Sequence, residues 1–106
     1  MATQFKLIFT TCKDQSEAKN IATALVAKKL AACVNILPNV TSIYIWDGEI
    51  AESAEVKLLI KTKTEKVNEV FLTLKEMHSY EVPEIQVVDV VTGNLAYFNW
   101  MDEVLS

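Results

Sequence analysis

The Asp47-Gly48 dipeptide lies between two long strand-like stretches, and it limits how this chain can fold more than any other feature. Asp-Gly between alternating apolar residues predicts a two-residue hairpin, because this tight turn needs positive φ angles. The outgoing arm runs from Leu30 to Trp46, with Pro38 as an expected bend, and the return arm runs from Ile50 to Thr62. Each arm is about fifteen residues long, whereas a usual strand has about five or six.

The remaining periodicities place one strand and one helix before the hairpin, and a helix, a strand and a short helix after it. The signals are a buried strand at Phe5–Thr11, helix starts at Asp14 (with Glu17), Thr64 and Asn94, and a last strand at Ile85–Thr92. Met77 closes the expected apolar stripe of the second helix. The order β-α-β-β-α-β-α predicts one α+β domain over residues 1–106, a ferredoxin-like sandwich with a long central hairpin.

The hairpin also predicts an oligomer. A sheet of four strands cannot cover arms of this length, so Tyr44, Ile45 and Trp46 near the tip would be exposed, together with two strand edges. Exposed edges and large apolar tips favour aggregation unless a partner covers them. We therefore expect a closed homo-oligomer whose hairpin arms pair with neighbouring subunits.

Composition excludes several classes of function. The net charge is −4 and no Lys/Arg cluster stands out, which argues against nucleic acid as a partner. No apolar run approaches the ~20 residues needed to span a membrane. Two cysteines, Cys12 and Cys33, fit a reducing cytoplasm, and Cys33 is expected to be a buried, inert thiol. With one histidine and only two glycines, the chain offers neither a nucleophile–base pair nor a phosphate loop, so we expect no enzyme.

Several stretches together resemble the CutA family of divalent-cation tolerance proteins. They are LAACVNI (30–36), SIYIWDGEI (42–50), Glu55 with LLIKT (58–62), HSYEVPEI (78–85), and Gly93-Asn94 with Tyr97 and Trp100. This resemblance, which covers nearly the whole chain, implies a ferredoxin-like subunit, a homotrimer and kinship with the trimeric PII signalling proteins. Ser79 stands where the family usually has proline, and losing that fixed φ predicts a looser loop.

His78, the only histidine, has two interpretations. It continues the apolar stripe of the second helix, so it can pack there and bond the last helix carbonyls. Alternatively it binds a metal ion, since imidazole suits copper and zinc and the thioether of Met77 suits Cu(I). The resemblance implies copper ligands at positions 10, 77 and 78, but the chain has Thr10 and Met77 at the first two. Cys12, two residues further on, is a candidate substitute.

Glu81 and Glu84 are a candidate acid/base pair. Pro83 disfavours the helical region for Val82, so an extended segment would direct the two carboxylates to opposite sides. We expect one of them to bond backbone amides or Lys61 and the other to be solvated.

Two functions follow. The first is a cytoplasmic homotrimer for divalent-cation tolerance that binds copper or another divalent cation weakly, with His78 as main ligand and Met77, Glu81 and Cys12 as helpers. The alternative is a non-enzymatic PII-like scaffold that binds a small ligand or a protein in inter-subunit clefts. Those clefts would be lined by Tyr80, Glu81, Lys61 and Trp46.

Overall fold

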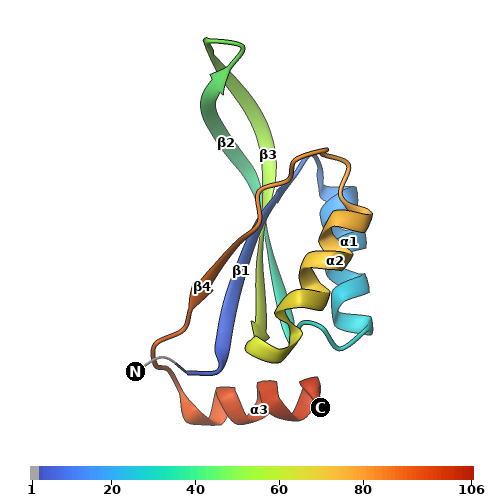
Figure 1. Cartoon of the computed structure of the whole chain (residues 1–106), viewed down its shortest axis with the longest axis vertical. Helices are drawn as coiled ribbons and strands as arrows, with labels where there is room; N and C mark the ends of the chain where they lie inside the picture. The colour runs from blue at the N-terminus through green and yellow to red at the C-terminus, as the bar shows by residue number, and fades with distance from the viewer. Residues whose placement is uncertain (1–2) are drawn as a thin grey trace.

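The computed structural model describes residues 3–106 as a four-stranded antiparallel sheet with three helices (Figure 1), which confirms the α+β class. The elements are β1 (Phe5–Cys12), α1 (Gln15–Ala27), β2 (Cys33–Trp46), β3 (Glu49–Lys63), a 3-10 turn (Thr64–Lys66), α2 (Val67–Met77), β4 (Gln86–Asp89) and α3 (Leu95–Leu105). The strand order is β2-β3-β1-β4, so β1 lies in the middle beside β3 and β4.

The long hairpin is confirmed. Asp47 and Gly48 have φ angles of 51° and 78°, which is the positive-φ pair that a tight turn needs. β2 has 14 residues and β3 has 15, and the outer part of the ribbon projects beyond the rest of the chain (Figure 1). The pairing register shifts between Leu37 and Val40, and Asn39 has a φ of 61°. Pro38 therefore bends the arm at a bulge, as expected.

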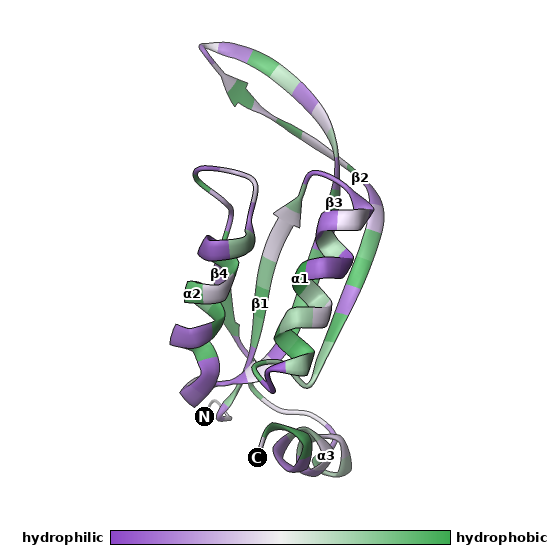
Figure 2. Ribbon diagram, turned by 90° about the vertical axis from the view of Figure 1, so that its right-hand side faces the viewer, coloured by the Kyte–Doolittle hydropathy of each residue, from purple (hydrophilic) through white to green (hydrophobic). Residues whose placement is uncertain are grey.

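The core lies between one face of the sheet and the two helices α1 and α2 (Figure 2). Alternate strand positions supply Ile8, Leu58 and Ile60, because successive side chains of a strand point to opposite faces. The helices supply a stripe of fully buried apolar residues, which are Ala18, Ile21 and Leu25 from α1 and Val70 and Leu74 from α2.

Two of the three expected helix caps are present. The carboxylate of Asp14 accepts the Glu17 N–H (2.8 Å), and the Asn94 side chain accepts the Ala96 N–H (2.9 Å). The cap predicted at Thr64 was wrong: its hydroxyl donates to the carbonyl of Gln4 (3.0 Å), and α2 begins after a 3-10 turn without a side-chain cap. The Thr64 N–H also donates to the Gln4 carbonyl (2.8 Å), so Thr64 is bound to the residue before β1 and not to the helix start.

Three further expectations need correction. β4 spans only Gln86–Asp89, because its ladder with β1 ends there. Met77 is 36% exposed, since α2 ends at that residue, and Thr73 lies in the buried stripe. Cys33 is only partly buried, because it begins β2, which forms an edge of the sheet.

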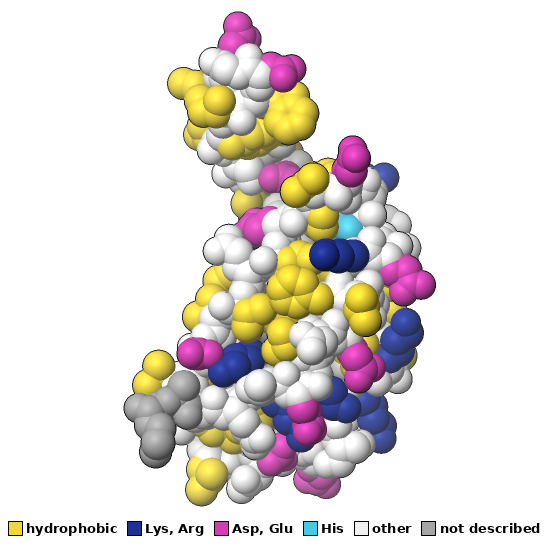
Figure 3. All heavy atoms as spheres, in the orientation of Figure 1, with side chains coloured by type: hydrophobic (Ala, Val, Ile, Leu, Met, Phe, Trp, Pro, Cys, Tyr) yellow, Lys and Arg dark blue, Asp and Glu magenta, His cyan; other side chains and the backbone are white. Residues whose placement is uncertain are grey.

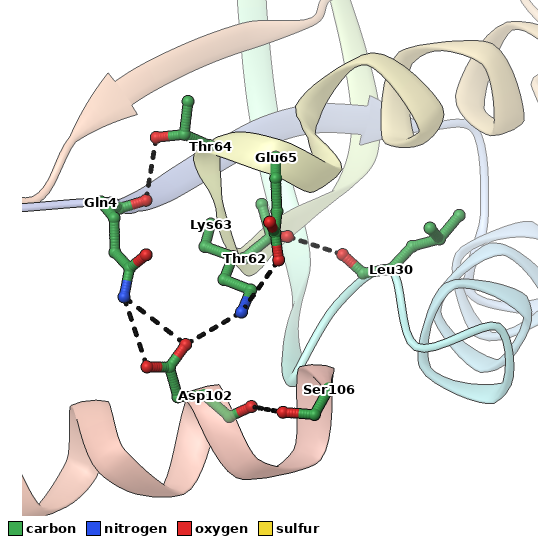
Figure 4. A network of polar contacts seen from close by, with 8 residues as sticks. All are labelled: Gln4, Leu30, Thr62, Lys63, Thr64, Glu65, Asp102 and Ser106. Atoms are coloured by element: carbon green, nitrogen blue, oxygen red, sulfur yellow. Dashed lines mark hydrogen bonds and ion pairs between the residues drawn. The ribbon is translucent and has the colours of Figure 1, made fainter.

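A polar network fixes α3 at the end of the sheet opposite to the hairpin tip (Figures 1 and 4). The Lys63 ammonium bonds Asp102 (2.9 Å) of α3 and Glu65 (3.0 Å), and the Gln4 amide also donates to Asp102 (3.3 Å). These contacts hold α3 against β1 and β3. Within residues 3–106, no helix has the length and hydropathy to cross a bilayer.

Candidate binding cleft

A cleft of about 870 Å³ lies between the outer part of the hairpin and the loop that follows α2. The hairpin contributes Tyr44, Ile45, Trp46, Ala51, Ser53 and Glu55; β1 contributes Thr11; and the loop contributes Ser79, Tyr80, Glu81, Val82 and Glu84. The size is that of a small-molecule site. The projecting ribbon thus forms one wall of a cleft whose other wall belongs to the body of the domain.

The hairpin wall follows from strand alternation. Ala51, Ser53 and Glu55 are two residues apart on β3, so their side chains point to the same face. Tyr44 pairs with Ala51 across the ribbon, and its hydroxyl shares a 2.6 Å hydrogen bond with the hydroxyl of Ser53. This face of the ribbon therefore presents an aromatic ring beside a hydroxyl and a carboxylate.

Tyr80 connects the loop to the hairpin. Its hydroxyl donates to Oε2 of Glu55 (2.6 Å), and its backbone N–H donates to Nδ1 of His78 (3.2 Å). Burial raises the pKa of the Tyr80 phenol, and the hydrogen bond to the Glu55 carboxylate raises it further. Tyr80 therefore remains a protonated donor to Glu55.

His78 lies behind this wall with a side chain that has no exposed surface. Its Nε2 is 2.9 Å from the carbonyl oxygen of Thr11. A carbonyl can only accept, so Nε2 donates, and Nδ1 accepts from Tyr80; these two bonds select the neutral Nε2–H tautomer. The imidazole thus bonds a carbonyl of β1, and not the helix carbonyls expected from the sequence.

Ser79 is anchored to α1. Its N–H donates to Oε1 of Glu17 (2.6 Å) and its hydroxyl to Oε2 (3.0 Å), while Oε2 also accepts the Lys13 N–H (3.2 Å). Burial alone would raise the pKa of Glu17, but these hydrogen bonds from Ser79 and Lys13 lower it overall. Two hydrogen bonds to Glu17 thus hold the loop at Ser79, where the family usually has the constraint of a proline ring.

Glu84 is held from three sides. Its carboxylate accepts from the Thr11 hydroxyl (2.6 Å) and from the Gln86 amide (2.9 Å), and Lys57 lies 3.5 Å away. The Thr11 hydrogen bond is the main reason why the pKa of Glu84 is lowered, against the effect of burial. The lysine that pairs with Glu84 is therefore Lys57, and not Lys61 as expected from the sequence.

Glu81 and Glu84 both line the cleft, which corrects the expectation that they point to opposite sides. The reason is local: the chain bends at residues 79–82 and is not fully extended before Pro83.

Three of the four residues expected in a ligand cleft, Tyr80, Glu81 and Trp46, line this one. Lys61 does not. It lines a smaller hollow near α3, and its ammonium lies 5.6 Å from the centre of the Tyr97 ring.

The residues expected to bind metal do not line one common site. Cys12 is fully buried, and burial raises the pKa of its thiol to about 12. Both ring nitrogens of His78 are hydrogen-bonded. Met77 lines a separate hollow beside α1, while Glu81 lines the main cleft. Among residues 3–106 no three His, Cys, Asp or Glu side chains converge on one point. These residues do not fit a preformed metal centre.

Sequence reasoning did not assign a role in the cleft to Glu55, Ser53 or Thr11. The alternation of positions 51, 53 and 55 beside an exposed hairpin tip is the signal that could have found the first two. Thr11 has no such signal, because its contact with Glu84 joins residues 73 positions apart in the chain.

These features define a class of protein: a small α+β domain whose sheet extends into a long ribbon with a cleft at its side. The family model of the "CutA1 divalent ion tolerance protein" matches residues 6–104. The chain belongs to this family.

Relatives and solved structures agree with this assignment. The chain is 42% identical over 98 residues to the "Divalent-cation tolerance protein CutA" of Thermus thermophilus, covering 92% of this chain and 95% of that protein. It is 44% identical over 96 residues to the "Protein CutA" of Homo sapiens, covering 91% of this chain but only 54% of that protein, about half its length. The crystal structure of CutA from Xylella fastidiosa superimposes with a TM-score of 0.95 at 38% identity, covering 98% and 100% of the two chains.

Proposed function

We propose that this protein serves divalent-cation tolerance as a cytoplasmic, non-enzymatic homotrimer of ferredoxin-like subunits, and that the cleft beside the hairpin is its binding site. The observation that carries the proposal is the cleft itself. Aromatic and carboxylate side chains from the ribbon and the loop converge there, and the hydrogen bond between Tyr80 and Glu55 joins its two walls.

The exposed apolar surface of the ribbon supports the homotrimer. Ile43 (68%), Trp46 (69%) and Ile50 (78%) are largely exposed. Hydrophobic side chains gather at the projecting tip in Figure 3. Apolar surface of this kind on a stable protein marks an interaction site. Light scattering at micromolar concentration should give three times the 11.9 kDa subunit mass. A monomeric mass would remove the proposed assembly.

Binding in the cleft can be tested without knowing the natural ligand. The protein, labelled with ¹⁵N, is screened against a fragment collection containing cations, anions and neutral molecules. Bound fragments should shift the amide signals of residues 44–55 and 79–84 and leave those of α2 unchanged. Fragments that bind reproducibly elsewhere on the protein and never in this cleft would contradict the proposal.

Weak binding of a divalent cation is a second candidate, favoured by the divalent-ion tolerance family to which the chain belongs. With His78 as main ligand, copper must displace either the hydrogen bond that Nε2 donates to the Thr11 carbonyl or the one that Nδ1 accepts from the Tyr80 N–H, and each stabilises the loop. Binding should therefore be weak. Calorimetry with Cu(II) compares the wild type with His78→Ala, and Met77→Leu, at an exposed position, separates the thioether from the imidazole. Equal isotherms for the wild type and His78→Ala would exclude His78 as a ligand.

A further inference from the structure

The resemblance to CutA proteins implies copper ligands at positions 10, 77 and 78, but the first of these has no suitable donor in this chain. Thr10 is fully buried in β1, and within residues 3–106 its hydroxyl has no hydrogen-bond partner. Imidazole, thioether and thiolate groups suit copper, whereas a neutral hydroxyl does not. Cys12, the candidate substitute, is also fully buried, and its thiol stays protonated because burial raises its pKa to about 12. Neither side chain of this strand therefore offers a copper ligand.

Met77 and His78 have different surroundings although they are neighbours in the chain. α2 ends at Met77, and His78 has extended backbone angles (φ −72°, ψ 137°). The Met77 side chain lines the hollow beside α1, whereas the imidazole of His78 bonds Thr11 of β1. The thioether and the imidazole therefore do not line one common site.

Both hydrogen-bonding positions of the His78 imidazole are occupied. A neutral imidazole has one N–H and one lone pair in the ring plane. Nε2–H donates to the Thr11 carbonyl (2.9 Å), and the lone pair of Nδ1 accepts the Tyr80 N–H (3.2 Å). The ring has no exposed surface, and a carboxylate oxygen of Glu17 lies 3.7 Å from Nδ1. A metal ion on either nitrogen would leave a carbonyl or an N–H without its partner, which is costly in the interior.

The same bonds hold the segment between α2 and β4. The carbonyl of Thr11 accepts from His78, and the hydroxyl of Thr11 donates to Glu84 (2.6 Å), so one residue of β1 bonds both ends of residues 78–84. Between these ends, Ser79 donates its N–H and its hydroxyl to Glu17 of α1 (2.6 and 3.0 Å). Residues 78–84 belong to no helix or strand, so side-chain bonds determine where they lie.

We infer that positions 10, 77 and 78 form no metal centre in this chain, and that His78 is instead the joint that fixes residues 78–84 to β1. The donors at these positions disagree with the implied copper site, whereas the joint uses both nitrogens of the imidazole. Divalent-cation tolerance then does not involve the His78 ring. This role excludes the second candidate function with His78 as ligand, and it does not depend on the cleft.

Zinc ions test the joint in the unmodified protein, because Zn(II) is diamagnetic and imidazole is one of its preferred ligands. The ring ¹⁵N signals of His78, the only histidine, report its tautomer in the full chain at pH 7. We expect the Nε2–H tautomer, and both ring signals should keep their positions when Zn(II) is added in excess over the protein. A shift of either ring signal with Zn(II), or an Nδ1–H tautomer, would overturn the inference.

His78→Gln and His78→Asn separate the joint from a metal ligand. The Gln amide can donate to the Thr11 carbonyl in place of Nε2, and the Asn amide can accept the Tyr80 N–H in place of Nδ1. Each variant should therefore unfold at a urea concentration roughly 0.5 M above the midpoint of His78→Ala. Calorimetry with Cu(II) should give the wild-type isotherm for all three. Equal midpoints for the three variants, or an isotherm that all three weaken, would contradict the joint.

Thr10→Val is the matched test at the other implied ligand position. It keeps the shape of the side chain and removes the unpartnered hydroxyl, so the urea midpoint should not fall. The Cu(II) isotherm should also stay that of the wild type. Weaker Cu(II) binding by Thr10→Val would restore position 10 as a ligand and refute the inference.

Discussion

The phenolic hydroxyl of Tyr80 lies 2.6 Å from a carboxylate oxygen of Glu55, and this single contact joins the loop after α2 to the projecting ribbon. The two residues are 25 positions apart in the chain, so the bond closes a large part of the fold. Behind the cleft wall, Nδ1 of His78 accepts a hydrogen bond from the backbone N–H of Tyr80 and so fixes the position of Tyr80. The shape of the cleft therefore depends on a chain of bonds from β1 through His78 and Tyr80 to β3.

Removing this hydroxyl should destabilise the protein modestly and alter the cleft. Tyr80→Phe loses one hydrogen bond to a carboxylate, and since both groups are partly exposed we expect a loss of about 1 kcal/mol in the free energy of unfolding. Urea denaturation at fixed protein concentration measures it. Tyr97→Phe, at an exposed position on α3, is the control and should cost less.

A double-mutant cycle distinguishes this bond from general packing. Tyr80→Phe and Glu55→Ala should be non-additive, with a coupling energy of about 0.5 kcal/mol or more. Additive effects would show that Tyr80 and Glu55 act independently and that the bond does not determine the shape of the cleft.

The local elements of this fold could be predicted from the sequence because each depends on neighbouring residues. Asp47-Gly48 determines its own turn, and Asp14 and Asn94 cap helices that begin next to them. Thr64 failed as a cap because its hydroxyl bonds Gln4, 60 positions away. Sequence patterns cannot rank a local cap against a distant partner of this kind.

The residues of the candidate site also divide into those that the local sequence predicts and those that depend on distant partners. Tyr80, Glu81 and Trp46 were expected in one cleft because each belongs to a polar or aromatic stretch beside the hairpin or the loop. Lys57, and not Lys61, reaches Glu84 because the pairing register decides which lysine of β3 lies near the loop: Lys57 pairs with Thr11, the residue that also binds Glu84. That register is a property of the tertiary structure, because it is set by the pairing of β1 with β3.

Acid should weaken the fold through Glu17. Its folded-state pKa lies below the ordinary value of 4.5. The folded state therefore binds fewer protons than the unfolded chain, so this stabilisation is present above pH 4.5 and is lost as the pH falls through the lower folded pKa. Urea denaturation between pH 7 and pH 3 should show the decline. Glu84, whose pKa is also lowered, should add to it less strongly because its carboxylate is about one-third exposed.

Glu17→Gln isolates that contribution. The variant should be about 1 kcal/mol less stable than the wild type at pH 7, since the bonds from Ser79 lose a charged acceptor. The difference should shrink at the acid end, where Glu17 of the wild type is itself protonated. Curves that stay parallel from pH 7 to pH 3 would show that Glu17 is not the titrating group.

The thiol of Cys12 should be unreactive while the protein is folded. Its pKa is raised to about 12 by burial first and by the charges of Glu17, Asp14 and Glu55 after that, so almost none is thiolate at pH 8. Iodoacetamide at pH 8 should leave Cys12 unmodified in the native protein and alkylate it completely in guanidinium chloride, as peptide mass mapping can record. Alkylation of native Cys12 at the unfolded rate would contradict this and would restore Cys12 as an accessible metal ligand.

The two glycines should respond differently to alanine. At Gly93 a Cβ would lie 2.7 Å from Cζ of Phe98, whose ring stacks on Phe5 at a centroid distance of 4.5 Å, so the substitution displaces a packed aromatic pair. Such overpacking costs about 2 kcal/mol. Gly48 has open space around it but a φ of 78°, so alanine there costs about 1 kcal/mol in backbone strain alone.

A second substitution separates the two mechanisms. Phe98→Leu replaces the ring that a Cβ at position 93 would strike with a shorter side chain. The stability lost on Gly93→Ala should therefore be smaller in the Phe98→Leu background. The penalty of Gly48→Ala should be the same in both backgrounds, because the turn lies at the opposite end of the molecule from α3 (Figure 1). If Phe98→Leu leaves the Gly93→Ala penalty unchanged, the cost at Gly93 arises from the backbone, and the stacked pair of Phe5 and Phe98 does not limit that position.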